Sequence, residues 1–253
     1  MRRPSPSWSG TALAALLLSA SLGGCFDFFA DPQTAAAEDF IRSEPYGELL
    51  IEIDYVSGTA PHADAVSLLK TRASERLDKP GGITHQSTAI DETRDVWSIN
   101  DLKRAEDRNR NFDPAGNRMV LYVLYVDGHS DQDSDDARVL GVRYGATSVA
   151  IFKESIRDGS LLTGAFGVRE VERSVLVHEF GHAIGLVNLG IDMVRPHEDA
   201  DSRGHSSNDA SVMWHAIETS DIFAFLSPPP NDFDCDDKRD VQAAGGKPPG
   251  QGC

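Results

Sequence analysis

The sequence predicts a mixed α/β domain, and three observations carry that prediction. Short apolar runs with a strand-like pattern alternate with runs in which apolar residues recur at helical spacing. The run Met119–Val126 (MVLYVLYV) is apolar on both faces, which is typical of a central strand. The chain has 253 residues and is 40% hydrophobic, which is enough for one sizeable core.

The order of the expected elements is strand, helix, strand, helix and then further strands. Gly58 and Pro61 end the first strand, and Pro80 lies just beyond the first helix. Ser98 is a candidate cap for the second helix. The expected elements are Glu48–Val56, His62–Leu77, Ile83–Ile90, Asn100–Asn109, Met119–Val126, Val139–Tyr144 and Thr147–Phe152, followed by a glycine-containing loop over Arg157–Gly167, a helix over Arg173–Val187 and a short helix over Asp236–Ala244.

The N-terminus has the pattern of a targeting segment. Arg2 and Arg3 precede the apolar stretch Thr11–Leu22, which is too short for a stable transmembrane helix. The sequence LGGC that ends at Cys25 resembles a bacterial lipobox, in which the signal is removed before a cysteine that becomes lipidated. The alternative is an ordinary secretory signal with a chance cysteine. We expect a signal peptide over 1–24, a lipid-anchored tether over 25–46, a folded domain over 47–246 and a tail over 247–253.

The acidic composition of the chain disfavours some classes of binding partner. The formal net charge is −16 and the sequence pI is about 4.8, which disfavours nucleic acid or an anionic membrane surface as a partner. We therefore expect a monomer that reaches the membrane through its lipid anchor only. Export allows Cys235 and Cys253 to form a disulfide that clamps the tail. We place the protein in the cell envelope, at the outer membrane if the host has one.

One stretch, Arg173–Val187 (RSVLVHEFGHAIGLV), contains the pattern HExxH. On a helix, His178 and His182 lie on the same face, one turn apart. Two imidazoles in that arrangement can share one Zn²⁺, and Glu179 beside them is suited to take a proton from water. The alternative is that both histidines are ordinary polar residues of a half-buried helix. Their apolar surroundings favour the metal site, because an unpaired buried polar group is costly.

A catalytic zinc site needs a third protein ligand and one open position. Gly185 follows His182 by three residues, and a glycine there lets the chain leave the helix sharply. The pattern resembles the metzincin signature, HExxHxxGxxH followed by a methionine turn, but the third-ligand position holds Asn188. Three residues are candidates for that role: Asn188, His197 and His205.

Spacing to the methionine favours His205. Matrixins carry a third histidine that is followed by Ser-Ser and, eight residues on, by the turn methionine. Here His205 is followed by two serines and, at that distance, by Met213. The chain thus resembles a matrixin-type motif with an insertion before the third histidine. We expect His205 to complete the site and keep His197 and Asn188 as alternatives. Asn188 is less favoured because a neutral amide oxygen is a poor zinc ligand.

The resemblance implies a fold and an activity. The fold would be a metzincin-like mixed sheet with an active-site helix and a small irregular C-terminal subdomain. Thr147–Phe152 would be the edge strand that pairs with substrate, Met213 would pack beneath the metal, and Asp237–Gly246 loosely resembles the matrixin C-terminal helix. Residues 47–246 would be the catalytic domain of a zinc-dependent endopeptidase with one Zn²⁺, Glu179 as the base and a protein or peptide as substrate.

Two other functions and a second metal stay open. The chain could be a surface lipoprotein that keeps the fold to bind a protein or peptide without catalysis, or a structural domain in which zinc has four protein ligands. Calcium is less favoured. Asp131, Asp133 and Asp135 alternate, as do the aspartates of the run 232–236, but both runs lack the glycine and glutamate of an EF-hand loop.

Overall fold

The computed structural model describes residues 37–253, apart from 136, 165 and 226. The expected signal peptide, Cys25 and most of the expected tether lie outside the described residues. Within the described part of the chain, no helix combines the length and apolar character needed to cross a membrane.

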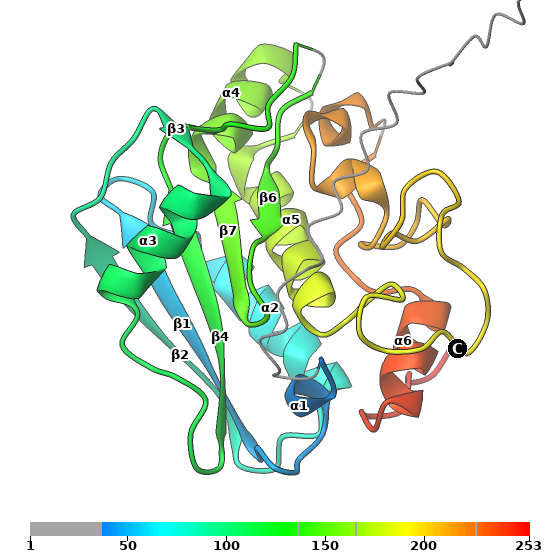
Figure 1. Ribbon diagram of the computed structural model, residues 1–253. Helices are drawn as coiled ribbons and strands as arrows, with labels where there is room; N and C mark the ends of the chain where they lie inside the picture. Colours follow the sequence, from blue (N-terminus) through cyan, green and yellow to red (C-terminus); the bar gives the residue numbers. More distant parts are fainter. Residues whose placement is uncertain (1–36, 136, 165, 226) are drawn as a thin grey trace, which may run out of the picture.

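The fold is the mixed α/β type expected, built on one five-stranded sheet (Figure 1). Its strands are β1 (Glu48–Val56), β2 (Gly82–Ile90), β4 (Arg118–Val126), β6 (Gly141–Arg143) and β7 (Ser148–Phe152), and a separate pair consists of β3 (Val96–Trp97) and β5 (His129–Ser130). The order is β2-β1-β4-β7-β6, in which the first four strands are parallel and β6 is antiparallel to β7.

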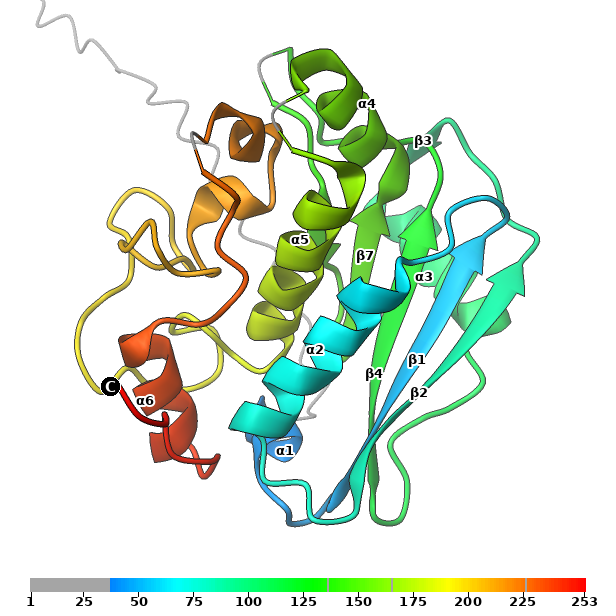
Figure 2. The ribbon, with the colours of Figure 1, turned by 180° about the vertical axis from the view of Figure 1, so that it is seen from behind.

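Helices cover both faces of the sheet. They are α1 (Ala37–Ile41), α2 (Ala63–Arg76), α3 (Ile99–Asn109), α4 (Lys153–Thr163), α5 (Val168–Ala183) and α6 (Cys235–Ala243), with the 3₁₀ turns η1 (His215–Ile217) and η2 (Ser220–Ala224). α2 and α5 pack side by side on one face, and α3 lies on the other (Figure 2). α6 and the irregular segment from 188 to 211 lie beyond the C-terminal part of α5.

The central strand β4 has the double-sided burial that its sequence predicts. Met119, Leu121 and Val123 face the core beneath α2 and α5, whereas Leu124 and Val126 face α3. Removing an aliphatic side chain of this size from water contributes about 1.5–3 kcal/mol. Burial on both faces therefore places β4 in the middle of the sheet that supports the site.

Ser98 caps α3 as predicted. The Asp101 backbone N–H donates to the Ser98 hydroxyl at 3.2 Å, and the Ser98 N–H donates to the Asp101 carboxylate at 3.1 Å. This reciprocal pair satisfies two backbone donors that have no partner within the helix.

Two local expectations are wrong. Thr147–Phe152 was expected at the sheet edge, but β7 lies between β4 and β6, and β6 is the edge strand. The Arg157–Gly167 region was expected to be a loop, yet α4 runs through Thr163. Gly159 lies inside that helix, and a Cβ added there would lie 2.0 Å from the Phe223 ring. The glycine therefore permits close packing of α4 against η2.

The expected tether also overlaps the folded domain. α1 falls within 25–46, and its Phe40 and Ile41 are fully buried. The Lys79 ammonium donates to the backbone carbonyls of Asp39, Arg42 and Tyr46. Residues 37–46 are thus packed onto the domain, because both apolar burial and charged hydrogen bonds tie them to it.

Candidate metal centre

α5 carries the two histidines of the HExxH pattern into the core. Every residue from Ser174 to Ala183 is buried, so the helix has no solvent-exposed face along this stretch. His178 is fully buried and His182 is nearly so. The histidines are therefore surrounded by protein, and their polar atoms must find partners within it.

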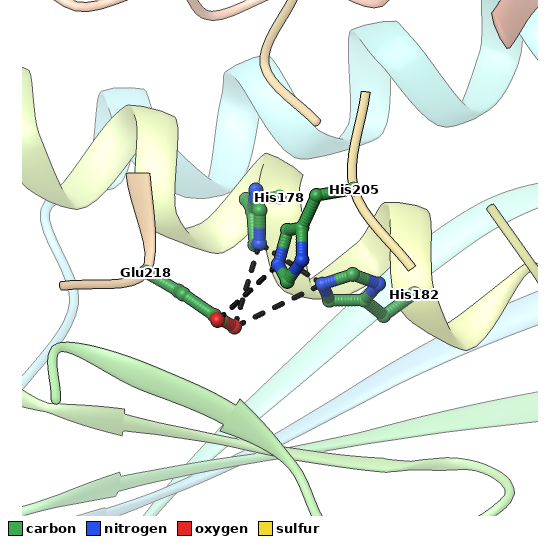
Figure 3. A group of neighbouring side chains, drawn as sticks. All are labelled: His178, His182, His205 and Glu218. Carbon is green, nitrogen blue, oxygen red and sulfur yellow. Dashed lines mark hydrogen bonds and ion pairs between the residues drawn. The ribbon is translucent and has the colours of Figure 1, made fainter. Parts of the chain in front are cut away.

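The backbone fixes the tautomers of both rings. His178 Nδ1 lies 2.7 Å from the carbonyl oxygen of Val212, and His182 Nδ1 lies 3.0 Å from that of Leu186. A carbonyl oxygen only accepts, so each Nδ1 carries the proton and each Nε2 carries a lone pair. The two Nε2 atoms are 2.9 Å apart (Figure 3). Two lone pairs that face each other at this distance repel unless a cation lies between them.

His205 supplies a third imidazole. The backbone N–H of Asp199 donates to the His205 carbonyl at 2.8 Å, and that of Ser207 donates to the His197 carbonyl at 2.8 Å, so the two segments pair in antiparallel fashion. The preceding Gly204 has φ +85°, a backbone conformation that favours glycine. His205 Nδ1 lies 3.2 Å from the carbonyl oxygen of Arg203, which leaves Nε2 directed at the other two rings.

Glu218 completes the cluster, and the sequence reasoning missed it. Its carboxylate oxygens lie 3.2 Å from Nε2 of His205, 3.6 Å from Nε2 of His178 and 3.9 Å from Nε2 of His182. Each of the four residues offers one ligand atom within 4.8 Å of the others. Glu218 lies five positions after Met213, and no motif marks it. Its nearness to the methionine turn was the one available signal.

The two alternative third ligands lie elsewhere. Asn188 has φ +58° and donates from Nδ2 to the Glu198 carboxylate at 2.9 Å. His197 is buried against α6, where Nε2 lies 2.7 Å from the Asp240 carboxylate. The structure brings neither of them to the cluster of His178, His182, His205 and Glu218.

Glu179 lies beside the cluster in a fully buried position. Neither of its carboxylate oxygens has a hydrogen-bond partner among the described residues. Burial raises the pKa of Glu179 well above its usual value, the charge of Glu218 adds to the rise, and Arg143 opposes it. A carboxylate with a raised pKa is suited to accept and release a proton near neutral pH.

The electrostatics of the imidazoles follow from burial and from Glu218. Burial lowers the pKa of His178 and of His182, which keeps both rings neutral, as metal ligands must be. For His205 burial acts downward, but the Glu218 carboxylate outweighs it and raises the pKa. For Glu218 burial acts upward, but His205 and His178 outweigh it and hold its pKa well below the usual value.

The methionine turn packs directly beneath the histidine helix. A Cβ added at Gly181 would lie 2.2 Å from the Met213 sulfur, so only glycine allows this approach. The Ser206 N–H donates to the Met213 carbonyl at 2.8 Å, and the Met213 N–H donates to the Ser211 hydroxyl at 2.9 Å. The turn therefore links the third-histidine segment to the carbonyl of Val212, which orients His178.

The remaining predicted features fall as follows. Cys235 and Cys253 form the expected disulfide. The carboxylate of Asp133 binds Arg138 and the Val139 backbone N–H. Among the described residues, no metal-type grouping of histidine, cysteine and carboxylate side chains includes the acidic run 131–135.

Comparison with known proteins finds similarity in structure but no match in sequence. No protein-family profile matches the chain, and no curated protein matches it. Archaemetzincin from Methanopyrus kandleri is similar in structure, with a TM-score of 0.51 and 13% identity over 78% of this chain and 96% of that one. A zinc-dependent peptidase from Methanocorpusculum labreanum aligns with a TM-score of 0.49 and 13% identity over 76% of this chain and 99% of that one. The chain thus has a mixed α/β fold similar to that of archaemetzincin.

Proposed function

We propose that this protein is a zinc-dependent endopeptidase of the cell envelope. One observation carries the proposal. Three imidazole Nε2 atoms, from His178, His182 and His205, converge beside the buried and unpartnered carboxylate of Glu179. Three imidazole nitrogens with an adjacent base are the composition of a hydrolytic zinc site.

The donor set fits zinc. The Nε2 lone pairs of His178 and His182 face each other, and Nε2 of His205 lies with them beside the Glu218 carboxylate. Bound at these nitrogens, zinc would polarise a peptide carbonyl and lower the pKa of water to about 7. Glu179 would accept the water proton and deliver it to the departing amine. The backbone carbonyls of Val212 and Leu186 would hold two of the rings in the required orientation.

The sheet edge next to Glu179 suits an extended peptide. Tyr144 N–H donates to the Ser148 carbonyl at 3.1 Å, so by strand alternation Gly141 and Arg143 direct their backbone groups away from β7. A Cβ added at Gly141 would lie 2.6 Å from the Glu179 carboxylate. A substrate strand that paired with β6 would therefore pass close to the base.

The test is peptide hydrolysis under metal control. The zinc-loaded domain should cleave members of a fluorogenic peptide library, a chelator should stop cleavage, and added zinc should restore it. Glu179→Gln should abolish cleavage and keep zinc, because the amide preserves shape but cannot accept the proton. Zinc-loaded protein that cleaves nothing in the library, or undiminished cleavage by Glu179→Gln, would overturn the proposal.

A second candidate rests on Glu218. With its carboxylate as a fourth ligand the site has four protein ligands, which is the composition of a structural zinc site. The protein would then use its fold to bind a protein or peptide partner without hydrolysis. Tight zinc binding with no turnover in the wild type and in a Glu218 variant would favour this function over the first.

The envelope location is supported by the N-terminal sequence and by the disulfide. The basic residues, apolar stretch and LGGC pattern at the N-terminus support export and lipidation at Cys25. A disulfide between Cys235 and Cys253 suits the oxidising conditions outside the cytoplasm. These features are independent of the metal centre, so the location and the activity are separate proposals.

A further inference from the structure

A second cluster of metal-type ligands lies between α6 and the irregular segment before it. Its members are His197, Asp234 and Asp237, each with one ligand atom within 4.8 Å of the others. His197 and Asp237 are buried, and Asp234 is half-buried. None of the three belongs to the cluster around His178, so the observations below stand apart from the proposed peptidase activity.

The geometry of His197 directs a lone pair into this cluster. Its Nε2 lies 2.7 Å from the Asp240 carboxylate, which fixes the proton on Nε2 when the ring is neutral. Its Nδ1 is buried without a hydrogen-bond partner among the described residues, as is Oδ1 of Asp237. These two atoms are 3.8 Å apart, too far for a hydrogen bond but suited to ligands of one cation with bonds of about 2.0–2.2 Å.

Hydrogen bonds orient the carboxylates of Asp234 and Asp237, and Oδ1 of Asp237 is left for an ion. Asp234 caps α6 through Oδ1, which accepts the N–H groups of Asp236 and Asp237, and its Oδ2 accepts the side-chain amide of Asn208 at 2.8 Å. Asp237 Oδ2 accepts the Ser211 hydroxyl at 2.5 Å and the Asp234 N–H at 3.1 Å. These contacts hold both carboxylates in fixed orientations, which reduces the entropy lost on binding an ion.

The negative charge of the cluster would also be balanced by a bound cation. Asp234, Asp237 and Asp240 bring three carboxylates around one imidazole. Among the described residues, the ion pairs of Asp237 and Asp240 are with His197. Buried carboxylates of this kind are paired or coordinate metals, because an unpaired charge in a low-dielectric interior is costly.

We propose that His197 Nδ1, Asp234 and Asp237 bind a second divalent cation, with Asp240 orienting the imidazole. One nitrogen and two carboxylate ligands match Zn²⁺ better than Ca²⁺ or Mg²⁺, which take oxygen ligands. The carboxylate that bonds the second imidazole nitrogen is the usual partner of a zinc-bound histidine.

Such an ion would join the two segments that shape the first centre. Asp237 holds the Ser211 hydroxyl at the methionine turn, and the His197 carbonyl accepts the Ser207 N–H beside the third histidine. A cation between Asp237 and His197 would therefore clamp both segments to α6. Its role is structural, because it lies outside the cluster that faces Glu179.

Zinc stoichiometry tests the proposal on the folded domain. Protein dialysed against a weak chelator should retain two zinc ions per chain in the wild type and one in His205→Ala, which disables the first centre. Asp234→Asn should also retain one, and the double variant none. Asparagine caps helices as well as aspartate does, so this variant keeps the fold while it weakens the ligand. Asp232→Asn is the matched control, because Asp232 pairs with Lys238 and Arg72 outside the cluster, and it should retain two.

A second measurement needs no change at the proposed ligands. In His205→Ala, one equivalent of zinc should raise the Tm, equal concentrations of calcium or magnesium should not, and Co²⁺ should give visible absorption bands. A folded His205→Ala protein that binds no zinc and no Co²⁺ would overturn the second site. So would a double variant with Asp234→Asn that still binds one zinc. Failure of peptide hydrolysis alone would leave these readouts unchanged.

Discussion

The Glu218 carboxylate lies 3.2 Å from Nε2 of His205, at the end of the imidazole ring that points away from the His205 backbone (Figure 3). Glu218 thereby places a negative charge at the point where three imidazole nitrogens meet. A carboxylate there neutralises part of the charge of a bound ion, and it also competes with water for the remaining coordination position.

The first prediction concerns this competition. Glu218→Gln should weaken zinc affinity by about tenfold, which corresponds to about 1.4 kcal/mol, because a neutral amide is a weaker ligand. The same change should raise kcat, because it frees the open position. Chelator competition measures the affinity and peptide cleavage the rate. Unaltered affinity would show that Glu218 is not a ligand, and lower kcat with zinc retained would show that the carboxylate assists the reaction.

The second prediction separates the three residues considered for the third ligand. His205→Ala should weaken zinc binding at the first centre by more than a hundredfold and remove cleavage. Asn188→Ala should leave zinc affinity unchanged and lower the free energy of unfolding by about 1 kcal/mol, because alanine adopts a φ of +58° less readily than asparagine and the hydrogen bond to Glu198 is lost. Asn188→Gly is the control and should lose less. Zinc titration with urea unfolding checks the set, and normal affinity in His205→Ala would contradict it.

The third prediction concerns Gly181, one of the two variable positions inside HExxH. Gly181→Ala would set a methyl group 2.2 Å from the Met213 sulfur and 3.0 Å from the Phe233 ring. We expect a loss of about 1–3 kcal/mol in the free energy of unfolding, together with weaker zinc binding, because the displaced turn carries the Val212 carbonyl. Adding Met213→Ala should restore part of the zinc affinity by removing the clash. If Gly181→Ala binds zinc as tightly as the wild type, the turn does not orient His178.

The fourth prediction is a pH dependence of stability. Burial raises the pKa of Asp54 from 3.8 to about 6, partly opposed by a hydrogen bond from Tyr122. In the unfolded chain the carboxyl ionises near pH 4, whereas in the fold it stays protonated until about pH 6. The contribution of the Asp54 carboxyl to the free energy of unfolding is therefore fully present below pH 4. About 3 kcal/mol of it is lost as the pH rises to 6.

Asp54→Asn removes that titration while it keeps a neutral group of the same shape. Urea unfolding between pH 4 and pH 7 should show a smaller fall in the free energy of unfolding for the variant than for the wild type. Parallel curves for the two proteins would show that Asp54 is not the group responsible.

The fifth prediction concerns the anchor. Cys25→Ser should leave the protein without lipid and move it from the membrane to the soluble fraction, because the acyl chains supply the membrane affinity. Mass spectrometry and cell fractionation measure the change. Wild-type protein without lipid, together with a variant that remains in the membrane, would contradict the lipobox assignment.

The extent to which the sequence predicts the site depends on how locally each residue is positioned. His178, Glu179 and His182 lie within one helical turn, so their spacing alone specifies their relation. His205 was favoured through the two serines that follow it and its distance from Met213, and its approach depends on pairing with the segment around His197. Glu218 arrives from a chain segment with no periodicity, and only the folded path of the chain reveals it.

The elements of the fold also differ in how far their own sequence predicts them. β4 was predictable because burial on both faces leaves a continuous apolar run. α1 has five residues, too few to show a helical period, so its burial was not evident. The position of β7 inside the sheet depends on β6 turning back antiparallel, and the sequence of neither strand contains that information.

The burial of α1 sets a working distance for an anchored protein. Ala37 Cβ lies 2.7 Å from the place where a Cβ on Gly185 would be, so the chain enters the domain beside the turn that follows His182. Twelve Cα–Cα steps join Cys25 to Ala37, and they can span at most about 40 Å. If Cys25 is lipidated, the metal centre can reach only a thin layer above the membrane. The selection of substrates would then begin with their height above the lipid rather than with their sequence.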